Sequence, residues 1–165
     1  MPPCPTRVLG IDPGSRLCGW GVVDRDGARL THVDNGVVVL TDGAPLAERL
    51  DRLWSALSDV IARYRPAQAA VETIFTNRNA RAALILGQAR GAALAALAHG
   101  GLAVHEYTPQ QVKKSVTGSG RADKAQVQHM ITLRLELPEP PQADAADAVA
   151  VALCHAQHGG AGPPG

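Results

Sequence analysis

The sequence predicts a single α/β domain in which helices flank a mixed sheet of five strands. Three strand-like segments follow one another near the N-terminus, and helical and strand-like patterns alternate after them. Consecutive strands with short turns form an antiparallel meander, whereas strands separated by helices can add in parallel, so the sheet should be mixed. A chain of 165 residues suits one compact domain. We expect this domain to span residues 1–157, followed by a disordered tail rich in Gly and Pro over residues 158–165.

The first half of the chain contains three strands and one helix. Apolar runs predict strands over residues 6–12, 17–24 and 28–40, separated by the turn-forming sequences PGS and DRDG. Pro45 then opens a helix that extends to about Tyr64. The apolar residues of this helix recur every three or four positions and are therefore predicted to be core: Leu46, Leu50, Leu53, Trp54, Leu57, Val60 and Ile61.

The second half alternates strands and helices. The expected elements are a strand over 68–72, a helix over 79–98 and a strand over 102–107. Thr108 and Pro109 provide a helix cap and a first helical position, and Asp123 followed by Gln126 resembles another helix start. A last helix should begin after the prolines near residue 140.

The helix over 79–98 is apolar or small nearly all round, which indicates burial on more than one side. Gly87 and Gly91 lie four residues apart and would let another backbone approach closely. One side of the helix can therefore face the sheet while the other faces a second subunit in a twofold dimer. Burial wholly within one subunit is the alternative.

Four carboxylates interrupt apolar segments. Asp12 and Glu72 each end a predicted strand, while Asp144 and Asp147 lie three apart where the last helix begins, on one helix face. Taken alone, Asp12 suits a turn, and the two later acids suit the first turn of a helix. Buried charges, however, are tolerated mainly when they are paired or bind a metal. Together the four acids favour one shared metal site.

Composition describes a soluble globular protein without a signal sequence or membrane span, which predicts a cytoplasmic location. Hydrophobic residues make up 45% of the chain, and aromatic residues 3%. Cys4, Cys18 and Cys154 are widely spaced and fit neither a disulfide framework nor a zinc motif, so they should be free thiols.

The formal net charge of +1 hides an uneven distribution. Residues 73–134 contain eight Lys and Arg against two Asp and Glu, an excess of six positive charges, so the rest of the chain carries −5. A positive surface beside clustered carboxylates suits a polyanion that approaches a metal site, although an ordinary solvated face is the alternative.

Six motifs resemble those of the RuvC family of bacterial Holliday junction resolvases, in order from about Arg7 to His155. They are IDPGSR, AVETIF, NARAALILGQARG, QQVKKSVTGSG, KAQVQHM and PQADAADAVAVA. The resemblance implies a ribonuclease-H-like fold, a homodimer and magnesium-dependent cleavage of four-way DNA junctions. It assigns the family's four acidic catalytic positions to Asp12, Glu72, Asp144 and Asp147, and implies RuvA and RuvB, the branch-migration proteins, as partners.

Carboxylate oxygens suit Mg²⁺ or Mn²⁺, and two such ions can bind one phosphodiester between them. We expect Asp12 to bridge both ions, with Glu72 on one side and Asp144 and Asp147 on the other. Hydrolysis would leave a 5′-phosphate and a 3′-hydroxyl.

DNA contacts are expected from the positive segment. Phe75, three residues past Glu72 in a polar loop, is the single phenylalanine and is predicted to wedge against or stack on an unpaired base, although core packing is its ordinary role. The resemblance favours Lys113 and Lys124 as phosphate ligands, and Lys114 and Arg121 belong to the same basic segment. The glycines between them lack P-loop spacing.

Three other functions share some of these features. An RNA–DNA hybrid hydrolase has a similar acidic cluster but does not require two paired sites. A sugar-kinase or actin-like ATPase also has an acidic turn after its first strand, but needs a second domain and phosphate loop that this sequence does not show. A noncatalytic junction-binding scaffold would not need the four acids.

Overall fold

The computed structural model describes residues 4–40, 43–73 and 79–158. In these residues, five strands form one mixed sheet with the order β3-β2-β1-β4-β5. The first three strands pair antiparallel, and the last two add in parallel, as predicted. The strands are β1 (Thr6–Asp12), β2 (Leu17–Asp26), β3 (Arg29–Val39), β4 (Gln68–Glu72) and β5 (Ala103–Tyr107). The helices are α1 (Leu46–Tyr64), α2 (Ala80–His99), α3 (Pro109–Thr117), α4 (Lys124–Arg134) and α5 (Ala143–Gln157).

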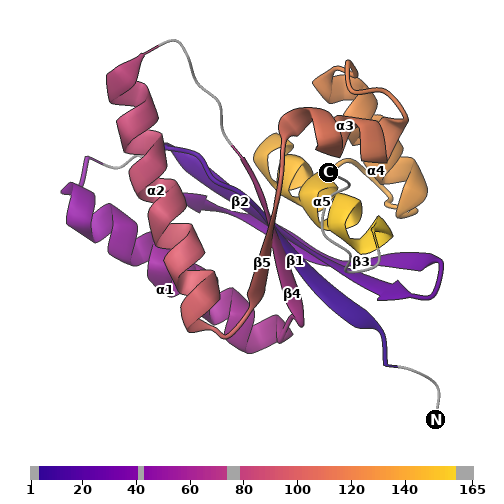
Figure 1. Ribbon diagram of the computed structural model, residues 1–165, viewed down its shortest axis with the longest axis horizontal. Coiled ribbons are helices and arrows are strands. Elements are labelled where there is room, and N and C mark those ends of the chain that lie inside the picture. The colour runs from indigo at the N-terminus through magenta and orange to yellow at the C-terminus, as the bar shows by residue number, and fades with distance from the viewer. Residues whose placement is uncertain (1–3, 41–42, 74–78, 159–165) are drawn as a thin grey trace.

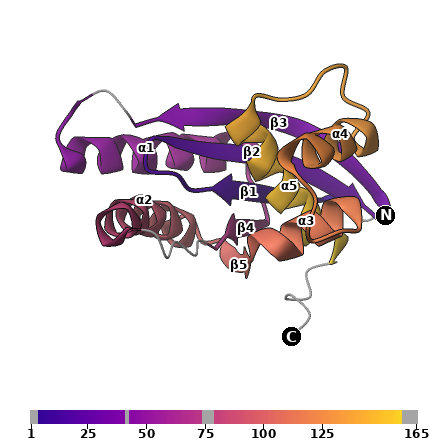
Figure 2. The ribbon, with the colours of Figure 1, turned by 90° about the horizontal axis from the view of Figure 1, so that it is seen from above.

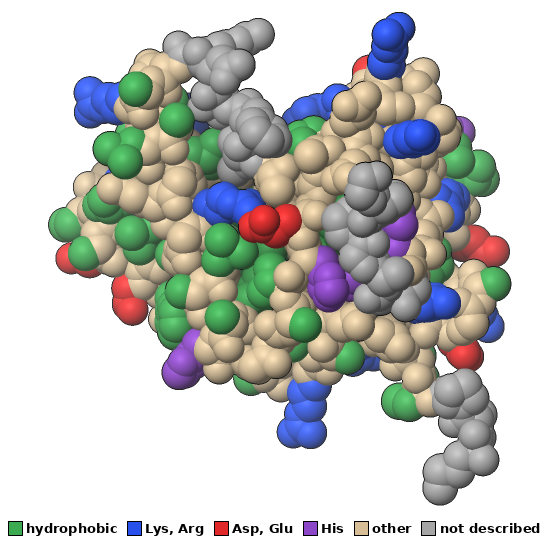
Figure 3. Space-filling model, viewed as in Figure 1, with side chains coloured by type: hydrophobic (Ala, Val, Ile, Leu, Met, Phe, Trp, Pro, Cys, Tyr) green, Lys and Arg blue, Asp and Glu red, His purple; other side chains and the backbone are tan. Residues whose placement is uncertain are grey.

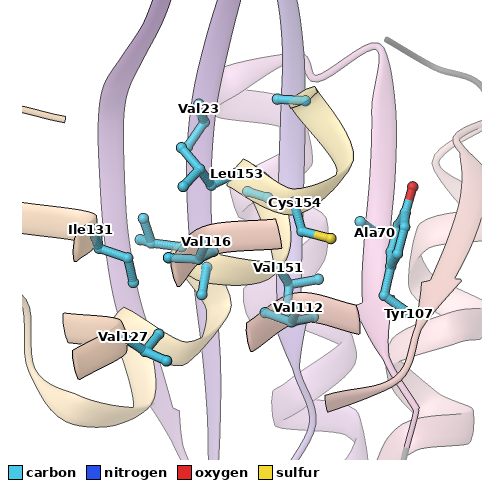
Figure 4. Close-up of a cluster of buried hydrophobic side chains, with 14 of the residues drawn as sticks. Val23, Ala70, Tyr107, Val112, Val116, Val127, Ile131, Val151, Leu153 and Cys154 are labelled. Atoms are coloured by element: carbon cyan, nitrogen blue, oxygen red, sulfur yellow. The ribbon is translucent and has the colours of Figure 1, made fainter. Parts of the chain in front are cut away.

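Helices cover both faces of the sheet, α1 and α2 on one side and α3, α4 and α5 on the other (Figures 1 and 2). Successive residues of a strand point to opposite faces. In β1, Val8 accordingly joins the core cluster beneath α3 to α5, whereas Leu9 and Ile11 join the cluster beneath α1 and α2. The first cluster is shown in Figure 4, where side chains from α3, α4 and α5 meet Val23 and Ala70 of the sheet.

Glycines of the sheet let the backbone of α5 lie directly on β1 and β2. A Cβ atom at Gly10 would lie 2.3 Å from the Ala148 carbonyl oxygen, and one at Gly19 would lie 2.0 Å from the Asp144 carbonyl oxygen. Real Cβ atoms essentially never approach backbone so closely, so any larger residue would push the helix away. This close packing brings the first turns of α5 beside the end of β1.

Helix caps fix where α3, α4 and α5 begin. Thr108 accepts a hydrogen bond from the Gln111 backbone N–H (3.1 Å), and the Gln111 side chain accepts one from Thr108 N–H (2.8 Å). Asp123 and Gln126 form the same reciprocal capping box, so both predicted starts are confirmed. Gln142 caps α5 by accepting from the backbone N–H groups of the next turn.

Among the described residues, nothing covers one face of α2, which argues against the alternative of burial wholly within one subunit. Ala89, Ala93 and Leu97 are buried against the sheet, whereas Leu84 is 64% exposed. A Cβ at Gly87 or Gly91 would meet no described atom within 4 Å. Figure 3 shows exposed hydrophobic side chains over the part of the surface that α1 and α2 form.

α2 is also long and apolar enough to cross a membrane, since it has 20 residues and an 18-residue window with a mean hydropathy of 1.2. A single helix of this kind is weak evidence for a span, because helices that pack on a sheet pass the same test. α2 has one buried face and carries the half-buried Arg90 in its middle. Both features are typical of a helix that packs on a sheet.

Candidate active site

Asp12 and Glu72 lie side by side at the carboxyl ends of adjacent parallel strands. The register pairs Ile11 with Val71, so the next residue of each strand is one of these acids. Ile11 and Val71 belong to the cluster beneath α1 and α2, so strand alternation directs the acids toward α5. The sequence therefore predicted correctly that both acids end buried strands.

Asp147 of α5 joins the two strand acids around one cavity of about 300 Å³. Lys113 of α3 and Lys124 at the start of α4 also line it. The Lys124 Nζ lies 3.3 Å from Asp147 Oδ2, and its side chain is 78% exposed compared with 21% for Asp147. Apolar walls are provided by Pro109, Val112, Val127 and Ala150.

The crowding of these acids raises their pKa values. Burial raises the pKa of Asp12 most, and the neighbouring Glu72 raises it further. Burial also raises the pKa of Glu72, although its proximity to Asp12 partly opposes this. The pKa of Asp147 is raised by burial, although Lys124 opposes this. The cavity therefore favours whatever neutralises its negative charge, such as a proton, an ammonium group or a cation.

Asp144 occupies a different position from the other three acids. It is not among the side chains that line the cavity, and its Oδ2 accepts a hydrogen bond from Gln142 Nε2 (3.0 Å). Its charge nevertheless contributes to raising the pKa of Asp147, so it lies within electrostatic range of the cluster. The predicted grouping thus has three acids in the cavity wall and a fourth, Asp144, one helical turn before Asp147.

The predicted DNA ligands separate into two groups. Lys113 and Lys124 line the acidic cavity, whereas Lys114 is exposed on α3 outside it. Arg121 lies at a separate hollow of about 580 Å³ together with Asp123 and His129. Phe75, the predicted stacking residue, lies outside the described residues.

Among the described residues, no group of three or more His, Cys, Asp and Glu side chains meets the geometry of a metal-binding group. Asp12 instead lies next to Glu72, and Asp147 forms an ion pair with Lys124. The donor set still fits a hard divalent cation, because three carboxylates with raised pKa values line one cavity and offer oxygen ligands.

Sequence reasoning missed one polar contact of the site. The guanidinium of Arg90 on α2 donates to the main-chain carbonyl of Glu72 (2.7 Å). No spacing rule could have found this contact, because it joins residues on different elements. The available signal was the charge of Arg90 in the middle of a largely apolar helix.

The sheet order and the carboxylate cavity are those expected of a nuclease with a ribonuclease-H-like fold. Comparisons with known proteins identify the family within this class. The model of the crossover junction endodeoxyribonuclease RuvC family matches residues 8–155. This chain belongs to that family.

Individual relatives agree over almost the whole chain. The crossover junction endodeoxyribonuclease RuvC of Citrifermentans bemidjiense is 54% identical over 153 residues, which cover 93% of each chain. That of Trichlorobacter lovleyi is 56% identical over 149 residues, covering 90% of this chain and 84% of the relative. The solved structure of Thermus thermophilus RuvC in complex with Holliday junction substrate is 38% identical, with a TM-score of 0.88, over 93% of this chain and 94% of the other.

Proposed function

We propose that this chain is an endonuclease that resolves four-way DNA junctions by hydrolysing two phosphodiesters at symmetric positions. The observation that carries the proposal is the convergence of Asp12, Glu72 and Asp147 from three elements on one cavity shared with two lysines. The identity with RuvC relatives, and the junction bound in the Thermus structure, support DNA junctions as the substrate.

In the proposed mechanism, Asp12, Glu72 and Asp147, with Asp144 close by, would hold two Mg²⁺ ions, for which Mn²⁺ could substitute. When bound, such ions would supply a lowered pKa for the attacking water and charge stabilisation for the leaving 3′ oxygen. Lys113 and Lys124 attract the scissile phosphate into the cavity and orient it. The products carry 5′-phosphate and 3′-hydroxyl ends. The apolar wall formed by Val112, Val127 and Ala150 restricts water around the carboxylates.

A homodimer would present two such sites to the two strands of a junction that are cut. The exposed face of α2, with Leu84, Gly87, Gly91 and Ala95 at helical spacing, supports this helix as the dimer contact. Family membership supports RuvA and RuvB as partners, and a cytoplasmic site of action on chromosomal DNA.

The test is cleavage of a synthetic four-way junction whose arms share a homologous core. The protein is incubated with Mg²⁺ or with EDTA, and the incisions are mapped on every strand. Paired incisions at symmetric positions that disappear in EDTA support the proposal. Cleavage of an RNA–DNA hybrid in preference to the junction would favour a hybrid hydrolase, and ATP hydrolysis without cleavage would overturn the proposal.

A further inference from the structure

Arg90 makes two contacts at the boundary between α2 and the sheet. Its Nη1 donates to the main-chain carbonyl oxygen of Glu72 (2.7 Å), and its Nη2 forms an ion pair with Glu106 Oε1 of β5. The Arg90 side chain is 18% exposed, whereas that of Glu106 is 49% exposed. Because the guanidinium is largely desolvated and bound by two partners, the Arg90 side chain is held in one conformation.

The main-chain carbonyl of Glu72, at the end of β4, requires a hydrogen-bond donor from outside the sheet. Thr73 N–H donates to the Tyr107 carbonyl of β5 (2.8 Å), so the Glu72 carbonyl in the same trans peptide points away from β5, toward β1. Continuing the register of Ile11 with Val71 by two residues places Pro13 alongside Thr73. Proline has no N–H, so β1 cannot donate to this carbonyl, and the Arg90 guanidinium takes that place.

The contact therefore reaches Glu72 from behind the sheet. The Glu72 carboxylate faces the cavity on the α5 side, while Arg90 fixes its main chain from the α2 side. A carboxylate that ends a strand is oriented by the peptide units on either side of it. Without Arg90, the last peptide of β4 would be held only by the Thr73 N–H bond to Tyr107, so it could tilt and carry the carboxylate away from Asp12.

We propose that Arg90 is a positioning residue, which fixes the Glu72 carboxylate in the acidic cavity by binding the Glu72 main-chain carbonyl. This inference rests on the proposed role of Glu72 as a metal ligand. Arg90 touches neither substrate nor cation in this account. It acts through the strand end, and it links the helix with the exposed apolar face to the cavity.

Arg90→Met tests the proposal, because it keeps the apolar stem of the side chain and removes its donors. Loss of such an outer contact typically costs about 10- to 100-fold in metal affinity or activity. We expect a loss of this size in Mn²⁺ affinity, measured by calorimetry on the DNA-free protein, and in the single-turnover rate of junction cleavage. Junction affinity in EDTA should remain that of the wild type, because Lys113 and Lys124 are untouched.

Three further variants separate positioning from general stability. Arg90→Lys retains one donor and should restore most of the Mn²⁺ affinity, and Glu106→Gln retains an acceptor for Arg90 and should have the smaller effect. Arg29→Met makes the same change at an exposed guanidinium at the start of β3 and should leave Mn²⁺ binding unchanged.

Wild-type Mn²⁺ affinity and cleavage in Arg90→Met would overturn the proposal, as would losses in Arg90→Met and Arg90→Lys that only follow reduced melting temperatures. If the wild-type protein failed to cut junctions, the proposed function would be refuted. The Mn²⁺ affinities of the wild type and Arg90→Met would still test whether Arg90 positions Glu72.

Discussion

At the scale of single residues, the acidic cavity combines side chains whose charges oppose one another in the folded protein. Asp12, Glu72 and Asp147 are all partly buried, and burial is the largest cause of the raised pKa of each. Such an arrangement weakens the fold unless a cation is bound, as is common where a site is built for binding rather than for stability.

Asp12→Asn should abolish cleavage while stabilising the protein. Burial and Glu72 raise the pKa of Asp12 from 3.8 to about 8. A carboxyl whose pKa is raised on folding binds its proton more tightly in the folded state, so its deprotonation destabilises the fold as pH rises toward 8. The gain in Tm should therefore be larger at pH 9 than at pH 5, and about 1 kcal/mol corresponds to a rise of about 2–4 °C. Junction cleavage in Mg²⁺ should fall by about 10²- to 10³-fold or more. Wild-type cleavage by this variant would contradict the assignment of Asp12.

Lys113→Ala should weaken junction binding in a way that depends on salt. A lysine that neutralises one phosphate releases about one counterion, so its loss should reduce the slope of log K against log salt concentration by about 1. Anisotropy titrations between low and moderate NaCl, in EDTA, measure the slope. Lys114→Ala is the matched control, because Lys114 is exposed outside the cavity, and it should change the slope less. Equal slopes for Lys113→Ala and the wild type would argue against phosphate contact.

Phe75→Ala should impair opening of the junction near the cut. A base stacked on an aromatic ring gains about 1–3 kcal/mol, so its loss should reduce base unstacking, read from a fluorescent adenine analogue beside the scissile phosphate. Cleavage should slow in parallel. Unchanged fluorescence and rate would show that Phe75 does not stack on DNA.

At the scale of elements, the position of α5 depends on the glycines of the sheet beneath it. Gly10 and Gly19 let the helix backbone approach β1 and β2 at a distance that no other residue permits. The Gly19 contact is with the carbonyl of Asp144 itself, at the turn of α5 that carries the acids. Sheet and helix are thus matched in shape where the site is formed.

Gly19→Ala should therefore reduce both stability and cleavage. The added methyl group would lie 2.0 Å from the Asp144 carbonyl oxygen, so the start of α5 must move. Overpacking of this kind costs about 1–3 kcal/mol, measurable by urea unfolding, and the displaced Asp147 should lower the cleavage rate. Gly120→Ala is the control for stability, because the nearest atom there belongs to the flexible Gln110 side chain. If the two variants were equally stable, close packing at Gly19 would not hold α5 in place.

At the scale of the whole molecule, we predict that the face of α2 left uncovered by the described residues contacts a second copy of this chain. Leu84→Glu should shift the protein toward monomers in sedimentation velocity, because it places a charge in an apolar contact. Leu133→Glu is a matched control on α4, since Leu133 is 61% exposed and Leu84 is 64% exposed. Dimers of equal strength in both variants would exclude α2 as the contact. Loss of dimers in Leu84→Glu should also convert paired incisions into single nicks.

Much of this protein is determined by local features of its sequence. Strand alternation, the three- and four-residue spacing of α1, and the capping boxes of α3 and α4 involve neighbouring residues, so they predicted the elements and the mixed sheet. Acids at the ends of buried strands likewise revealed Asp12 and Glu72, because desolvation of a charge is costly wherever the strand is placed. The motifs added the family, which the relatives confirm.

Other properties were decided by tertiary structure, because they depend on distances between elements that the sequence separates. Helical spacing placed Asp144 and Asp147 on one face of α5, but the approach of α5 to β1 brings Asp147 into the cavity wall and leaves Asp144 bonded to Gln142. The largely apolar composition of α2 indicated burial on more than one side, whereas the described residues cover only the face toward the sheet. The bond of Arg90 to the Glu72 carbonyl joins side chain to main chain across 18 positions, and main-chain groups carry no sequence signal.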